Sequence, residues 1–165
     1  MPPSDGELER LYRECRQQLF TCALVITRSA ARAEDAVHDA FCGLLRGNRR
    51  PDDLRAYVFR AVRNAAVDQV RRRARDGEPL SDSIFDPAPQ PSQSAQDAEF
   101  RQQVVASLSK LSTDERETVV QHLYGELTFQ QIAAVRDVPL GTVVSWYRRG
   151  IEKLRSRLEV VDGSL

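Results

Sequence analysis

The sequence lacks most of the features that mark membrane, secreted and metal-binding proteins. It contains no run of about 18 apolar residues, the length that a membrane-spanning helix needs. Its first residues lack the basic and apolar regions of a signal peptide. Its three cysteines are odd in number and form no Cys-x-x-Cys motif, so they make neither a disulfide framework nor a zinc knuckle and fit a reducing compartment. We therefore expect a cytoplasmic protein without membrane insertion.

The usual signatures of catalysis are also missing. The chain has no glycine-rich phosphate loop, no Ser/His/Asp or Cys/His arrangement that can be assembled, and no pair of carboxylates that stands out from solvated ones. We expect neither enzymatic activity nor a cofactor.

Net charge is absent as well, because 24 basic residues balance 24 acidic ones. The balance hides a strong asymmetry between segments. Residues 46–75 carry a net charge of +7, whereas residues 76–100 contain six acids and no Lys or Arg. Such asymmetry indicates a polyanionic partner for the basic segment and a different role for the acidic one.

The acidic segment is also rich in proline, serine and glutamine. Four of the eight prolines lie in it. This composition cannot bury enough apolar surface to offset the entropy of ordering. We predict a flexible acidic linker over residues 76–99, which divides the chain into domains at 1–75 and 100–165. Free in solution, the linker is expected to fold back on the basic segment.

The first domain has the apolar periodicity of helices. Apolar residues recur at i, i+3, i+4 and i+7 over 8–26 and again over 33–44, where Ser29 is a candidate N-cap. A third helix is predicted from about Asp53 to Arg75. Its predicted core stripe consists of Leu54, Val58, Ala61, Val62 and Ala65.

The second domain has the order of elements typical of a helix-turn-helix. A helix marked by Phe100, Val104, Leu108 and Leu111 precedes two capping boxes, Ser112-Thr-Asp-Glu115 and Thr128-Phe-Gln-Gln131. The second box opens a short helix, and a turn at 136–139 leads into a final helix from Leu140 to about Leu158. The predicted fold class is all-α, with two domains so small that each should be marginal alone.

A helical wheel divides the final helix into two faces. The inward face is predicted to hold Leu140, Val143, Val144, Tyr147, Ile151, Leu154 and Leu158. The outward face, predicted to bind DNA, holds Thr142, Ser145, Trp146, Arg149 and Lys153. The alternative is a solvated face with one stray tryptophan.

The third helix carries a polar stripe that suits a nucleic acid. The stripe consists of Arg60, Asn64, Asp68, Arg71 and Arg75, flanked by Arg55, Arg63, Arg72 and Arg73. Arginines for phosphates, with Tyr57 beside the stripe for unstacked bases, favour single-strand or duplex-junction binding. The alternative is a solvated basic helix end with both aromatics in the core, which we favour for Phe59.

The second helix has an acidic face opposite its core stripe. This face consists of Glu34, Asp35, His38, Asp39 and Cys42. His38 and Cys42 are one turn apart, as metal ligands can be, but no further ligand is in sight, so we predict no metal site. Cys15 and Cys22 fall on the apolar stripe and are expected to be small core residues. His122 has no obvious partner.

The order of these parts resembles a known family. The matching segments are Ala33-Glu-Asp-Ala-Val-His-Asp-Ala-Phe41, Leu54 to Asp68 with Arg71-Arg-Arg, Leu111-Ser-Thr-Asp-Glu-Arg116, Gln131-Ile-Ala133 and Gly141-Thr-Val143. In this order and spacing they resemble bacterial RNA polymerase sigma factors of the extracytoplasmic-function group. The resemblance covers residues 8–75 and 108–158.

The resemblance implies a dissociable promoter-recognition subunit that acts with core RNA polymerase and promoter DNA. Asp35, His38 and Asp39 would dock on the clamp of the largest polymerase subunit, and the second domain on the flap of the second largest. The loop 46–53, with Asn48, Arg49 and Arg50, and the Asn64 stripe would hold the minus 10 element. Ser145, Arg148 and Arg149 would read the minus 35 element. Because many relatives are held by an anti-sigma protein, one is a candidate partner.

Two rival functions remain at this stage. The chain could be a stand-alone regulator that uses only the helix-turn-helix, which predicts tight duplex binding without polymerase. It could also be a helical adaptor, or degenerate sigma, that binds protein but opens no promoter.

Overall fold

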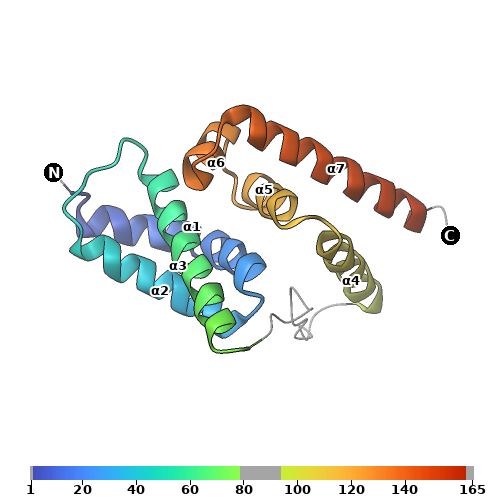
Figure 1. The fold of residues 1–165 in the computed structure, drawn as a ribbon, viewed down its shortest axis with the longest axis horizontal. Helices are drawn as coiled ribbons and strands as arrows, with labels where there is room; N and C mark the ends of the chain where they lie inside the picture. Colours follow the sequence, from blue (N-terminus) through green and yellow to red (C-terminus); the bar gives the residue numbers. More distant parts are fainter. Residues whose placement is uncertain (1, 79–93, 163–165) are drawn as a thin grey trace.

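The computed structural model describes residues 2–78 and 94–162, which form seven α-helices and no strand. The helices form an N-terminal and a C-terminal bundle that lie side by side (Figure 1). The N-terminal bundle consists of α1 (Asp5–Thr27), α2 (Ala30–Arg46) and α3 (Leu54–Arg75). The C-terminal bundle consists of α4 (Ala95–Ser109), α5 (Thr113–Leu123), α6 (Phe129–Arg136) and α7 (Leu140–Asp162). The all-α prediction is confirmed for these residues.

Side-chain caps determine where most of the helices begin. The hydroxyl of Ser29 accepts from the backbone of Arg32 at the start of α2, as predicted. Both predicted capping boxes form, at Ser112 before α5 and at Thr128 before α6. Each cap satisfies backbone N–H groups that have no partner within the helix. Asp53 is the N-cap of α3, one residue outside the helix itself.

The short helix α6 ends in a tight turn. Asp137 adopts a left-handed conformation, with φ of 53°, and its N–H returns to the carbonyl of Ala133. Asp is among the few residues that adopt this region readily. The turn then directs the chain into the long helix α7.

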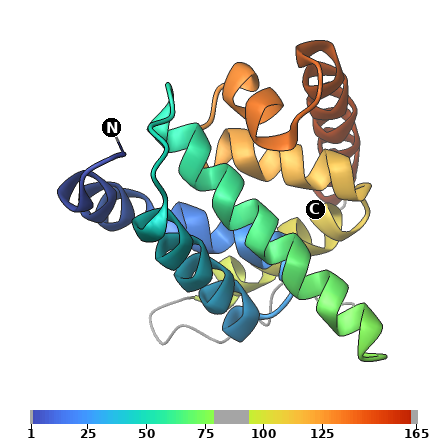
Figure 2. The same ribbon diagram turned by 60° about the vertical axis from the view of Figure 1, so that its left-hand side comes forward.

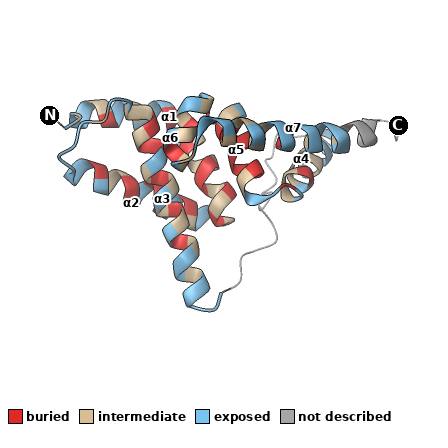
Figure 3. Cartoon of the chain, turned by 45° about the horizontal axis from the view of Figure 1, so that its top comes forward, coloured by how far each residue is buried: buried red, intermediate tan, exposed pale blue. Residues whose placement is uncertain are grey.

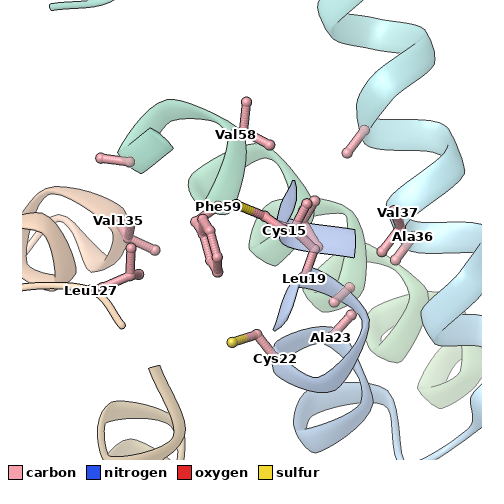
Figure 4. Close-up of a cluster of buried hydrophobic side chains, with 14 of the residues drawn as sticks. Cys15, Leu19, Cys22, Ala23, Ala36, Val37, Val58, Phe59, Leu127 and Val135 are labelled. Carbon is pink, nitrogen blue, oxygen red and sulfur yellow. The ribbon is translucent and has the colours of Figure 1, made fainter. Parts of the chain in front are cut away.

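One apolar core runs through both bundles. Leu19 and Val58 of the N-terminal bundle belong to the same cluster as Leu127, Ile132 and Val135 of the C-terminal bundle. Phe59 of α3 is buried, as predicted, and lies between the cysteines of α1 and the side chains of Leu127 and Val135 (Figure 4). Cys15 and Cys22 are buried core residues, which also confirms the prediction.

The bundles meet along two pairs of helices. Helix α3 lies against α6, and α1 lies against α5 (Figure 2). The sequence predicted two domains that a linker separates, and it gave no signal for this contact. Residues 79–93 of the predicted linker lie outside the described residues.

Two details of the predicted helices are wrong. Helix α4 begins at Ala95, inside the predicted linker, because residues 95–99 are good helix formers that follow the last proline of the segment. In the third helix, Ala56 and Ala66 are buried in place of Ala61 and Ala65, which are only partly covered. None of the helices in the described part of the chain is long and apolar enough to cross a membrane.

Candidate nucleic-acid interface

The polar stripe of α3 lies on a helix whose C-terminal half projects away from both bundles (Figure 3). The exposed side chains of the stripe include Arg60, Asn64, Asp68, Arg71 and Arg72. Three basic residues fall in the last turn of α3, where they also complement the negative end of the helix dipole. The exposed half of α3 therefore presents a dense positive surface to solvent.

A cleft of about 360 Å³ lies between α2 and α3 beside this stripe. Four of the predicted DNA-binding residues line it: Tyr57, Asn64, Asp68 and Arg72. Asp39 of α2 lines the opposite wall. The cleft thus combines an aromatic ring with hydrogen-bond donors and acceptors, which are the groups that a nucleobase needs.

The loop between α2 and α3 is exposed at its basic residues. Asn48, Arg49 and Arg50 are all accessible to solvent. Arg50 makes one ion pair, with Glu7 at 3.4 Å, and both partners are about half exposed. Such an exposed pair is weak, so the arginine remains available to a phosphate.

Two arginines of the predicted stripe instead contact the C-terminal bundle. Nε of Arg63 donates to the carboxylate of Glu117 in α5 at 2.5 Å. Arg60 donates to the carbonyl of Ala134 in α6 at 3.4 Å. Arg55, which flanks the stripe, donates to the carbonyl of Gly125 at 2.5 Å and to the sulfur of Cys15. Sequence reasoning missed these contacts because each partner lies 40 or more residues away in the chain.

The outward face of α7 is only partly free. Ser145, Arg148 and Arg149 are exposed, and Arg149 donates to the Ser145 hydroxyl at 3.1 Å. Thr142 and Trp146 are half-buried. The Arg136 guanidinium lies 4.8 Å from the centre of the Trp146 ring, in a cation–π contact.

Two positions of the helical wheel differ from the prediction. Leu140, predicted to face inward, is 44% exposed because it occupies the first position of α7, beyond the reach of the core. Lys153, predicted to face DNA, donates from Nζ to both carboxylate oxygens of Glu115, at 2.6 and 3.0 Å. Gly150, which the wheel did not single out, is buried where α7 crosses α5.

The C-terminal bundle also contains a ring cluster that the sequence reasoning missed. The His122 ring stacks on Phe129 with centroids 4.3 Å apart and meets Tyr147 edge-on at 4.8 Å. Nδ1 of His122 lies 2.8 Å from the carbonyl oxygen of Leu127. This cluster joins α5, α6 and α7 and gives His122 the partners that were not apparent from the sequence.

Helix α5 carries buried charges that belong to the structure of the bundle. Arg116 donates to the carbonyls of Leu108, Ser109 and Leu111, and burial, followed by the charge of Arg28, lowers its pKa. Burial alone would raise the pKa of Glu115, but hydrogen bonds from Lys153 and Ser112 and the Lys153 charge outweigh it and lower the pKa.

The acidic face of α2 is exposed at Glu34, Asp35, His38 and Asp39, and Cys42 is half-buried. The sulfur of Cys42 lies 3.6 Å from Nε2 of His38. Within the described ranges, no three His, Cys, Asp or Glu side chains gather in a way that could hold a metal ion. A groove of about 800 Å³ borders this face between α1 and α2, and Tyr12 and Phe41 are among its lining residues.

Comparison with known proteins places both bundles in one family. Residues 11–76 match the family model of sigma-70 region 2, and residues 107–156 match that of sigma-70 region 4. The chain is 30% identical to the ECF RNA polymerase sigma factor SigL of Mycobacterium tuberculosis, over 92% of this chain and 89% of the relative. It is 29% identical to SigE of Mycolicibacterium smegmatis, over 91% of this chain and 61% of that longer protein.

Solved structures share the fold across both bundles. The sigma factor RpoE of Bartonella quintana, in complex with the anti-sigma factor NepR, superimposes with a TM-score of 0.72 at 23% identity, over 93% of this chain and 98% of that one. CnrH in complex with the cytosolic domain of CnrY gives a TM-score of 0.66 at 22% identity, over 95% and 90% of the two chains. Taken with the region 2 and region 4 matches, these likenesses show that the chain belongs to the extracytoplasmic-function group of RNA polymerase sigma factors.

Proposed function

We propose that this chain binds core RNA polymerase and directs promoter recognition, strand opening and the initiation of transcription. The cleft between α2 and α3 is the observation that carries the proposal, because it places Tyr57, Asn64 and Asp68 around a space large enough for a nucleobase. The exposed arginines at the end of α3 lie beside it. Formation of phosphodiester bonds belongs to the polymerase, so the chain itself is not an enzyme.

The minus 10 element is held in this proposal by α3 and the loop before it. Arg71 and Arg72 neutralise phosphates, and Asn48, Arg49 and Arg50 approach the strand from the loop. Tyr57 offers a ring on which an unstacked base can lie, an interaction typical of single-strand binding. Arg60 and Arg63 add to this surface once their contacts with the C-terminal bundle are broken.

The minus 35 element is read as duplex by the helix-turn-helix formed by α6 and α7. Ser145, Arg148 and Arg149 are exposed on the first half of α7 and suit the base edges and phosphates of a major groove. Thr142 and Trp146 lie beside them and are half-buried. Lys153 contributes mainly to stability, because it is held by Glu115.

The polymerase is bound by both bundles. The exposed carboxylates of α2, together with His38 and Cys42, dock on the clamp of the largest subunit, and the adjoining groove adds apolar area to that contact. The C-terminal bundle docks on the flap of the second largest subunit. Polymerase thereby fixes the separation of two weak DNA-binding modules, which then act at a high effective concentration.

We infer the same three-part division that the sequence suggests, with domains at 1–75 and 100–165 and an acidic connection between them. An anti-sigma protein is a candidate partner, since the RpoE and CnrH structures are complexes with NepR and CnrY. The protein acts where the polymerase is, in the cytoplasm.

Run-off transcription tests the proposal. Purified core polymerase, the chain and a library of promoter fragments should give discrete transcripts that are absent without the chain. Tight specific duplex binding without transcripts would instead indicate a stand-alone regulator. Binding to core polymerase without transcripts on any promoter would indicate an adaptor. Failure to bind core polymerase would overturn the proposal altogether.

A further inference from the structure

The contact between the two bundles includes three polar bonds, which we call the clasp. Arg63 donates to Glu117, Arg55 donates to the carbonyl of Gly125, and Gln131 donates to the carboxylate of Asp53 at 3.0 Å. Each bond joins α3, or its N-cap, to α5, α6 or the loop between them. The clasp therefore fixes the bundles relative to each other more specifically than the apolar contact alone.

Glu117 is the central residue of the clasp. Its side chain is 4% exposed, and its carboxylate also lies 3.4 Å from Arg136, which contacts the Trp146 ring. One buried carboxylate therefore pairs an arginine of the minus 10 surface with an arginine that supports the minus 35 surface. Removing a partner from a buried charge is costly, because the remaining charge loses its compensation. The closed arrangement is stabilised accordingly.

The clasp restricts what DNA can reach. The side chain of Arg63 is 23% exposed, and its guanidinium is held by the Glu117 carboxylate, which competes directly with a phosphate. Arg71 and Arg72, two turns further along α3, remain exposed. While the bundles are closed, the C-terminal half of the stripe is free and the N-terminal half is covered.

We propose that the clasp is an autoinhibitory contact that keeps the free chain closed and withholds Arg60 and Arg63 from promoter DNA until binding to core polymerase separates the bundles. This inference rests on the proposed function, because the arginines matter only if α3 binds the promoter. It goes beyond that function by making the C-terminal bundle the internal competitor of the DNA.

A native thiol reports on this separation. Gly125 lies over Cys22 so closely that a Cβ at Gly125 would come within 3.4 Å of the sulfur. Burial raises the pKa of the Cys22 thiol to about 12, with a further contribution from the Glu117 charge. Iodoacetamide alkylates the thiolate, forming a C–S bond and releasing iodide, so Cys22 should react only when the bundles part. Cys42, half-buried on α2, serves as an internal reference.

The test compares Glu117→Gln with Asp114→Asn in the full chain. Both variants remove one carboxylate that contacts Arg136, but only Glu117 also contacts α3. Peptide-resolved mass spectrometry should show alkylation of Cys22 about tenfold faster in Glu117→Gln, the effect of losing one charged hydrogen bond. Asp114→Asn should match the wild type, and Cys42 should react equally in all chains.

A second variant covers the case in which Glu117→Gln does not fold. Arg55→Gln removes the bond to the Gly125 carbonyl without touching the buried carboxylate and should also accelerate Cys22. Circular dichroism identifies which variants remain helical. Unchanged alkylation of Cys22 in every folded variant would overturn the proposal.

Two further measurements link closure to DNA and polymerase. Without polymerase, Glu117→Gln should bind a mixed-sequence single strand of about 20 nucleotides roughly threefold more tightly than Asp114→Asn does. Addition of core polymerase should accelerate Cys22 alkylation in the wild type. If core polymerase binds and Cys22 stays protected, the autoinhibitory contact is refuted while the sigma function stands. If core polymerase does not bind, the proposed function fails, and closure is still decided by the two variants.

Discussion

At the scale of single residues, the ion pair of Glu115 and Lys153 shows how one contact can serve stability where a DNA contact was expected. Glu115 is almost fully buried, whereas the side chain of Lys153 is 48% exposed. The ammonium lies at hydrogen-bond distance from both oxygens of the carboxylate. The lysine therefore compensates a charge that would otherwise be buried alone.

We predict that Lys153→Met lowers the free energy of unfolding by about 1–2 kcal/mol at neutral pH, because the buried carboxylate loses its main partner. Urea unfolding followed by circular dichroism measures this loss. Lys153→Arg, which keeps the charge, should retain most of the stability. A methionine variant as stable as the wild type would show that the pair contributes nothing.

The same pair gives a pH dependence. The pKa of Glu115 in the folded chain lies below its ordinary value of 4.5. Its contribution to stability is therefore complete above that value and is lost as pH falls through the lower folded pKa. In Lys153→Met, acidification through the same range should cost less stability than in the wild type. Parallel unfolding series at acid pH would reveal the difference, and identical slopes would contradict it.

Gly150 gives a second prediction at this scale. A Cβ there would lie 2.7 Å from a methyl group of Val119, a buried residue of α5. We expect Gly150→Ala to destabilise the chain by about 1–3 kcal/mol through overpacking. Gly141→Ala, in open space on the same helix, is the matched control and should be neutral or slightly stabilising. Thermal unfolding of the two variants would separate these effects.

At the scale of elements, the sequence predicts the helices better than their surroundings. The periodicity and the caps placed α3 and α6 correctly because both signals are local. The outcome at Arg63 was not predictable in this way, since its fate depends on Glu117, which lies 54 residues away. A helical wheel treats a helix as isolated, so it assigned Lys153 to solvent and could not detect Glu115.

The two DNA-binding helices should respond differently to mutation. Arg149→Glu on α7 should reduce transcription most on promoters that depend on the minus 35 element, because Arg149 belongs to the base-reading surface. Arg71→Ala on α3 should weaken DNA binding with little sequence preference and lower the salt slope by about one. Run-off assays and salt titrations on the same promoters test both. Equal loss on all promoters for Arg149→Glu would remove it from the reading surface.

At the scale of the whole molecule, the acidic segment after α3 meets the basic surface where the structure describes it. The Glu78 carboxylate lies 2.9 Å from Arg32 and 3.4 Å from Arg73. This contact agrees with the expectation that the acidic segment folds back on the basic one. It suggests that the six acids of residues 76–100 compete with DNA for α3.

Replacing those six acids with Ser and Gln should therefore raise the affinity of the free chain for single-stranded DNA at low salt. The gain should shrink at high salt, where charge interactions are screened. Fluorescence anisotropy of a labelled oligonucleotide measures both conditions. Unchanged affinity at low salt would show that the segment does not shield α3.

The position of Trp146 under the Arg136 guanidinium gives the molecule its own optical probe. It is the one tryptophan of the chain, so its emission needs no label and no deconvolution. The same arginine contacts Glu117, so the indole is two side chains away from the junction of the bundles. Stopped-flow emission could thus follow, in real time and on unmodified protein, the order in which polymerase and promoter arrive.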